Sequence, residues 1–136
     1  MKFVKIAALS MTLAGLAAPA MALEPISKEK HINSVLLQGF IADKIADTCP
    51  SIEARKLRAL NELMKLRDYA LKQGYKADEV RAFVESKTEK ARGKAEAAEW
   101  LKKAGAVEGQ PETFCKIGRD EIAKGSLIGS LLRDKG

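Results

Sequence analysis

The sequence predicts an all-α fold, an up-down-up-down four-helix bundle stapled by one disulfide, and three observations lead to it. Apolar residues recur at steps of three and four along four segments, the spacing of amphipathic helices. The prolines that follow residue 22 lie outside the interiors of these segments, and no strand-like alternation interrupts them. The only two cysteines, Cys49 and Cys115, lie at segment ends that antiparallel packing brings together.

The first 22 residues have the pattern of a secretory signal peptide. Met1 to Lys5 carries two lysines, Ile6 to Ala17 is apolar, and Ala20-Met21-Ala22 fits a small-x-small cleavage site. We therefore expect cleavage after residue 22 and a single helical domain over residues 23–136. The expected location is the periplasm, with no transmembrane span in the mature form. An uncleaved membrane anchor is the alternative.

The charge of the mature chain is mildly basic. Removing the two signal lysines from the 24 basic residues leaves 22 against 18 acidic residues, a net charge of +4. This balance suits an acidic partner or an anionic membrane surface but requires neither. No nucleic acid is expected as a partner, because the compartment is wrong and no cluster of aromatic residues offers a stacking platform.

The first helix is expected from about Glu29 to Thr48. Gly39 lies inside it, and its cost to the helix is tolerated more easily where another backbone packs close. The second helix is expected from Ile52 to Gln73, with Ser51 as its N-cap and Gly74 as its C-cap. The apolar arc of this second helix is predicted to face the core; it consists of Leu57, Leu60, Leu63, Met64, Leu66, Ala70 and Leu71.

Two cations interrupt that apolar arc. Lys56 and Arg67 are eleven positions apart and therefore lie one above the other on a helix. A charged residue on a core-facing surface has to pair or extend to solvent. A structural ion pair with Glu89 or Glu121 is one interpretation, and a polar seam that meets a partner is the other.

The third and fourth helices complete the predicted bundle. The third opens at Asp78-Glu79 and continues through a Lys/Glu/Ala-rich stretch, with Gly93 as a possible bend, to Ala104. The fourth begins at Pro111, a favoured residue of the first helical turn, and its pattern extends to Leu131-Leu132-Arg133. Gly125 and Gly129 lie one turn apart, which suits ordinary close packing or the docking of a C-terminal tail on a partner.

Cys49 and Cys115 are expected to pair, because two cysteines in an exported chain most simply form a disulfide. Closing a loop of this length stabilises a fold by roughly 4 kcal/mol in the chain-entropy model. Two free buried thiols are the alternative.

Residues for catalysis are missing from the pattern. His31 is the only histidine and lies near an exposed helix start, where a solvated side chain is the simpler interpretation than a ligand or base. One histidine and two distant cysteines do not have the spacing of a zinc site. Redox, haem and phosphate-binding motifs are also missing, so we expect no enzyme, no metal and no cofactor.

Several strings resemble a known family. They are Ser51-Ile52-Glu53-Ala54-Arg55, Gly74-Tyr75, Glu89-Lys90-Ala91-Arg92, Pro111-Glu112-Thr113-Phe114-Cys115, Gly118-Arg119, Glu121-Ile122, Gly125-Ser126, Ile128-Gly129 and Leu131-Leu132-Arg133. Together they are similar to small exported alphaproteobacterial proteins catalogued as domain of unknown function 5333, over nearly the whole mature chain. The resemblance implies an uncharacterised exported protein with no catalytic residues to carry over. It also implies a respiratory or envelope complex as the unknown protein partner.

These observations favour a non-catalytic periplasmic module that binds another protein. The expected contacts are the segment from Gly118 to Arg133 and the basic face of the second helix. The individual residues expected to bind the partner are Arg55, Arg58, Lys65, Arg119 and Arg133. A small periplasmic stress-type holdase chaperone is one alternative, since acid would add positive charge and loosen the helices. An envelope membrane-surface binder is another, favoured by the basic balance.

Overall fold

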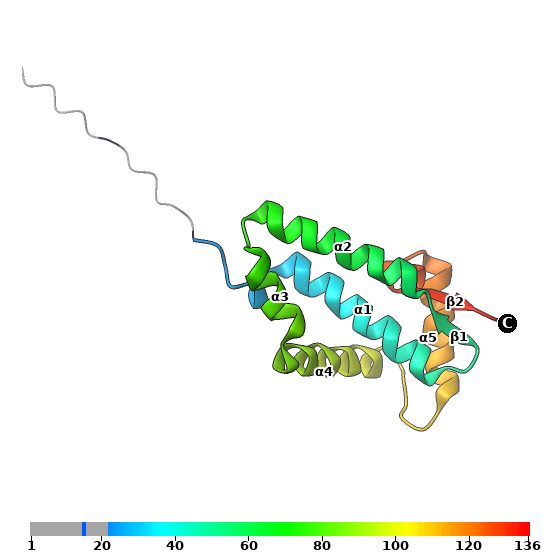
Figure 1. Ribbon diagram of the computed structural model, residues 1–136. Helices are drawn as coiled ribbons and strands as arrows, with labels where there is room; N and C mark the ends of the chain where they lie inside the picture. The colour runs from blue at the N-terminus through cyan, green and yellow to red at the C-terminus, as the bar shows by residue number, and fades with distance from the viewer. Residues whose placement is uncertain (1–14, 16–21) are drawn as a thin grey trace, which may run out of the picture.

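The computed structural model describes residue 15 and residues 22–136, and it shows a mostly helical protein (Figure 1). The predicted signal peptide, residues 1–22, lies outside the described residues apart from positions 15 and 22. The elements in chain order are η1 (Ile26–Lys28), α1 (Lys30–Thr48), β1 (Ile52–Ala54), α2 (Lys56–Gln73), α3 (Ala77–Glu85), α4 (Lys87–Lys103), α5 (Pro111–Lys124), α6 (Leu127–Ser130) and β2 (Leu132–Asp134).

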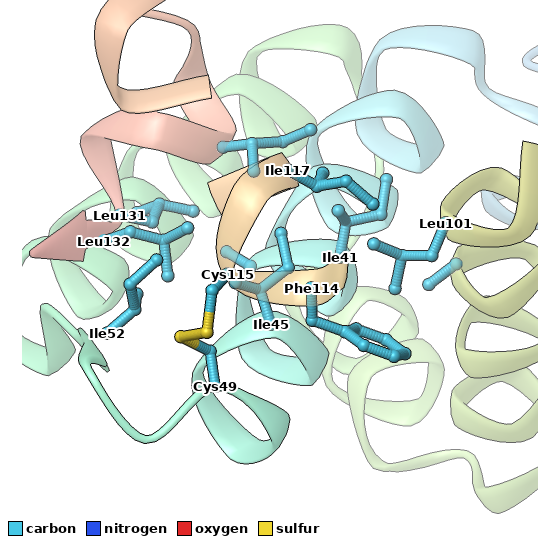
Figure 2. Packing of buried hydrophobic residues seen from close by; sticks show 13 residues of the cluster. Ile41, Ile45, Cys49, Ile52, Leu101, Phe114, Cys115, Ile117, Leu131 and Leu132 are labelled. Carbon is cyan, nitrogen blue, oxygen red and sulfur yellow. A yellow bond between two sulfur atoms is a disulfide. The ribbon is translucent and has the colours of Figure 1, made fainter. Parts of the chain in front are cut away.

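Helix α1 is the centre of the fold. Its N-terminus is capped by Glu29, whose carboxylate accepts a hydrogen bond from the backbone N–H of Ile32 at 2.6 Å. Helices α2, α4, α5 and α6 and strand β1 all pack against α1. Its residues Ile41 and Ile45 are almost completely buried and lie in the larger of two hydrophobic cores, beside Phe114 and Leu101 (Figure 2).

The predicted disulfide is confirmed. Cys49 at the end of α1 and Cys115 in the first turn of α5 are bonded, with Cα atoms 5.1 Å apart. Both residues are buried inside the larger core, between Ile45 and Ile52 (Figure 2). The staple therefore fixes α5 to the end of the central helix.

A two-stranded antiparallel sheet, which was not predicted, begins where the first turn of the second helix was expected. Strand β1 pairs antiparallel with β2, so that Ile52 lies opposite Asp134 and Ala54 opposite Leu132. Helix α2 consequently begins at Lys56, and the prediction of Ser51 as its N-cap is wrong. Pairing with the end of the chain satisfies backbone groups that a helical turn would otherwise bond, and it buries Ile52 in the core.

The predicted third and fourth helices are each divided. Ser86 ends α3 and caps α4, because its hydroxyl accepts the backbone N–H of Glu89 at 3.2 Å. Gly125 ends α5 in a left-handed conformation, and Ser126 caps α6. Figure 1 shows α1, α2 and α4 running lengthwise, with α3 across one end and α5 at the other. The up-down-up-down bundle is therefore not confirmed, although the helical class is.

A smaller core holds the other end of the molecule. Ile32 of α1, Leu66 and Ala70 of α2, and Val80 and Phe83 of α3 are buried together there. Nearby, the hydroxyl of Tyr75 donates a hydrogen bond to the carbonyl of Glu24 at 2.7 Å. Only the C-terminal half of α2 contributes buried side chains, so the first half of that helix is held much more loosely.

Candidate binding surface

The apolar arc of α2 is largely exposed. We call leucine stripe the five residues Leu57, Leu60, Leu63, Met64 and Leu71, whose surfaces are 80%, 54%, 46%, 50% and 41% exposed. The amphipathic pattern predicted that all five face the core, and that prediction is wrong. An amphipathic pattern indicates an apolar face but does not say whether the protein itself or a partner covers it.

A groove lies between α2 and α4, above α1. Its floor consists of Leu36, Gly39, Phe40 and Asp43 of α1, spaced so that they share one face of that helix. Its volume is about 320 Å³. Its ends are formed by Phe83 and Val84 of α3 on one side and, on the other, by Leu127 of α6 and Leu131, which directly follows α6. Helices α2 and α4 contribute the walls, with Ala59, Glu62, Leu63, Glu89, Lys90, Arg92, Gly93 and Glu96.

Gly39 shows that the floor of the groove is open. A Cβ atom built on Gly39 would meet nothing within 4 Å, so no backbone of the described residues packs closely against it to offset its cost to the helix. The contrast is Gly93 in the wall, where a Cβ would clash with the ring of Phe40. Gly93 is thus used by the fold itself, whereas Gly39 leaves space into which another chain can pack.

The groove continues into a second hollow beneath α2 and α3. This hollow has a volume of about 420 Å³. Four lining residues belong to both hollows: Leu36, Leu63, Phe83 and Val84. Leu63 belongs to the leucine stripe as well, so the stripe and the groove form one continuous apolar surface.

Charged residues border the groove with an acidic excess. Four of its lining residues are acidic and two are basic, a net charge of −2. Arg92 is occupied within α4, because it donates to Glu89 at 2.6 Å and to Glu96 at 2.9 Å. The hydrogen bonds to Glu89 raise the pKa of Arg92 above its ordinary value. Burial, followed by the nearby Asp47 carboxylate, raises the pKa of Asp43.

The predicted ion pairs of Lys56 and Arg67 are not formed. Arg67 contacts its neighbour Asp68 at 3.4 Å, and among the described residues Lys56 has no ion pair. The predicted acidic partners are occupied elsewhere: Glu89 binds Arg92, and Glu121 binds Lys124 at 3.0 Å. Both cations of the arc are exposed beside the leucine stripe, as the interpretation of a polar seam requires.

The residues predicted to bind a partner fall into two groups. Arg55, Arg58 and Lys65 lie together on the outer face of α2. Arg119 and Arg133 lie instead at the two-stranded sheet, where Arg119 donates to Asp134 at 3.1 Å and Arg133 pairs with Glu53. These two arginines hold the end of the chain in place. The groove itself was not predicted, because Leu36 and Phe40 in its floor belong to the apolar pattern that was expected to face the core.

Two further predictions concern Gly129 and His31. A Cβ on Gly129 would clash with the backbone of Glu121, so the prediction of ordinary close packing is confirmed for this residue. His31 is exposed, and its ring packs against Tyr69 with centroids 4.4 Å apart. Within residues 22–136 no group of three or more potential ligands could hold a metal ion. In the same part of the chain, no helix has the length and apolar character needed to cross a membrane.

Comparison with known proteins assigns the chain to a family. The model of a family of unknown function, DUF5333, matches residues 24–133, and the chain belongs to that family. The predicted resemblance is thereby confirmed. Neither a curated protein nor a solved structure matches the chain.

Proposed function

We propose that this member of the DUF5333 family is an exported, non-catalytic module that binds another polypeptide chain through the groove and the leucine stripe. Export is supported by the basic, apolar and small-residue pattern of the first 22 residues and, more weakly, by the disulfide. Mass spectrometry of the protein from the native host should find a chain that begins at Leu23. A retained residue 1 would remove this part of the proposal.

One observation carries the binding function: a helix with an apolar face exposes most of that face beside an empty groove. Full burial of a leucine side chain stabilises a protein by about 1.5–3 kcal/mol. Five large apolar side chains left partly in water on a single helix are therefore unfavourable for an isolated monomer. Contiguous exposed apolar patches of this kind are typical of interaction sites.

The shape of the surface fits a helical ligand. An amphipathic helix binds in a groove through apolar side chains spaced three and four residues apart. The floor of the groove has this spacing, at Leu36, Gly39, Phe40 and Asp43. The glycine in the middle allows the backbone of a docked helix to approach α1 closely.

Photocrosslinking in the native host tests this function directly. A photoreactive amino acid at position 60, in the leucine stripe, should form a covalent adduct with another polypeptide chain. The same amino acid at Lys116, exposed on α5, serves as the control and should form none. If position 60 yields no more adduct than position 116, the groove and stripe are not a protein-binding surface.

A second candidate, contact with an anionic membrane surface, is favoured by the charges around the stripe. Lys56 and Arg67 lie among the exposed leucines, and Arg58, Lys65 and Lys72 lie along one side of them. Apolar helices flanked by cations lie in membrane interfaces. Vesicle flotation that rises with the fraction of anionic lipid would support this candidate, and flotation independent of that fraction would exclude it.

A further inference from the structure

Two surfaces of the described part of the chain are exposed and complementary to each other. The groove is an open, largely apolar hollow of about 320 Å³, and the leucine stripe on α2 is an exposed apolar helix face. We propose that α2 of a second copy of this chain occupies the groove, so that each copy of a two-fold dimer covers the other. The inference rests on the proposed function, since it names the chain that the groove and the leucine stripe bind.

The geometry of the helices leaves one position for this second α2. Helix α1 packs against both α2 and α4, and the groove lies where a fourth helix would complete the group. The floor from Leu36 to Asp43 and the first part of the stripe, from Leu57 to Met64, both cover seven residue steps. At 1.5 Å per residue each is about 10 Å long. Two turns of stripe therefore match two turns of floor.

The charges of the two surfaces have opposite sign. Helix α2 carries five basic and two acidic residues, a net charge of +3, whereas the lining of the groove has a net charge of −2. A second α2 would bring Lys56 and Arg67, which form no ion pair with another helix among the described residues, toward acids of the groove such as Glu96. Opposite potentials on facing surfaces fix the register and speed association.

A second copy meets both requirements in one contact. A two-fold interface uses the same patch on each subunit, so one association covers the groove and the stripe of both copies. A foreign helix in the groove would cover the stripe only where it happens to extend across α2. The stripe and groove of this chain therefore favour its own α2 as the occupant.

Light scattering coupled to size exclusion tests the dimer on the oxidised mature protein. The wild type should have the mass of two chains at high concentration and dissociate on dilution, with weaker association at high salt. Leu60→Glu, in the stripe, and Gly39→Leu, in the open floor, should each weaken association by at least about tenfold. A tenfold change corresponds to about 1.4 kcal/mol, which is less than the contribution of one fully buried leucine. The matched control is Val107→Glu, which changes an apolar residue of similar exposure, 44%, in the loop after α4 and should leave association unchanged.

Circular dichroism of each variant shows that loss of association is not loss of folding. Gly39→Leu adds a side chain to open space, so its helix content should equal that of the wild type even if Leu60→Glu is destabilised. A wild-type protein that is monomeric at every concentration overturns the dimer. So does a dimer that both variants leave intact, because such a dimer uses another surface.

The photocrosslinking experiment separates failure of the dimer from failure of the proposed function. An adduct of two identical chains from position 60 supports both. If position 60 crosslinks only to a different protein, and the purified chain is monomeric, the second copy is overturned as the occupant. The groove then remains a protein-binding surface. No adduct from position 60 overturns both.

Discussion

Removal of the Cys49–Cys115 disulfide should lower stability mainly through the unfolded state. The bond closes a sequence separation of 66 residues. In the chain-entropy model, a loop of this length restricts the unfolded chain by an amount that stabilises the fold by about 4 kcal/mol at 25 °C. For a domain of this size, such a loss lowers the melting temperature by roughly 15 °C. Either single substitution, Cys49→Ala or Cys115→Ala, removes the cross-link completely, so each should cause most of this loss of stability.

Urea unfolding followed by circular dichroism measures this effect. The oxidised wild type is compared with the reduced wild type, the two single variants and the double variant, and the free energies form a double-mutant cycle. The double variant should unfold identically with and without reductant, which controls for effects of the reductant itself. If oxidised and reduced wild type unfold at the same urea concentration, the staple does not stabilise the fold. If the two single losses add in the double variant, lost packing of the sulfurs dominates instead.

Three further predictions separate the residues that maintain the fold from those that face the groove. Gly129→Ala should destabilise the protein by about 1–3 kcal/mol because its Cβ meets the backbone of Glu121, whereas Gly39→Ala, with open space around it, should stabilise α1 by up to about 1 kcal/mol in the same urea titration. In thermal unfolding at low protein concentration, Leu66→Ala should lower the free energy of unfolding by about 2–5 kcal/mol, because Leu66 is buried. Leu57→Gln should change it by less than about 0.5 kcal/mol, because Leu57 is exposed, and equal losses for the two variants would contradict the exposed stripe. Because the pKa of Asp43 is raised, its charged form destabilises the fold above the folded-state pKa, and Asp43→Asn should be more stable than wild type at neutral pH. This gain should disappear as the pH falls below 3.8, the ordinary pKa of an aspartate, and a gain that persists there would show another cause.

Helix positions and the staple could be predicted because their causes are local or few. The periodicity of Ile32, Ile41 and Ile45 indicates α1 directly, and the helices end near glycines or prolines such as Gly74 and Pro111. With two cysteines, only one intramolecular pairing exists. The boundary between α3 and α4 at Ser86 was also predictable, because Ser86 and Glu89 have the spacing of a capping box.

The two-stranded sheet and the groove could not be predicted from local sequence patterns. Strand β1 has three residues, and its partner β2 lies about eighty positions later, so neither has a pattern long enough to identify. The apolar arc of α2 would look the same whether it were buried inside the protein or at an interface. The cations Lys56 and Arg67 within that arc were the available sign of exposure, because among residues 22–136 neither forms an ion pair with another helix.

The staple and the exposed leucine stripe have opposite effects on stability. The groove leaves leucines of α2 in water, each of which would contribute about 1.5–3 kcal/mol if fully buried. The disulfide lies in the larger core beside Ile45 and supplies about 4 kcal/mol without using α2. The buried side chains of α2, Leu66 and Ala70, lie in the smaller core instead, and only the half-buried Ala59 of α2 packs against the larger core among the described residues. A chain that covers the groove should therefore stabilise α2 most, and the reduced protein, which lacks the staple, should depend on that second chain more strongly than the oxidised protein does.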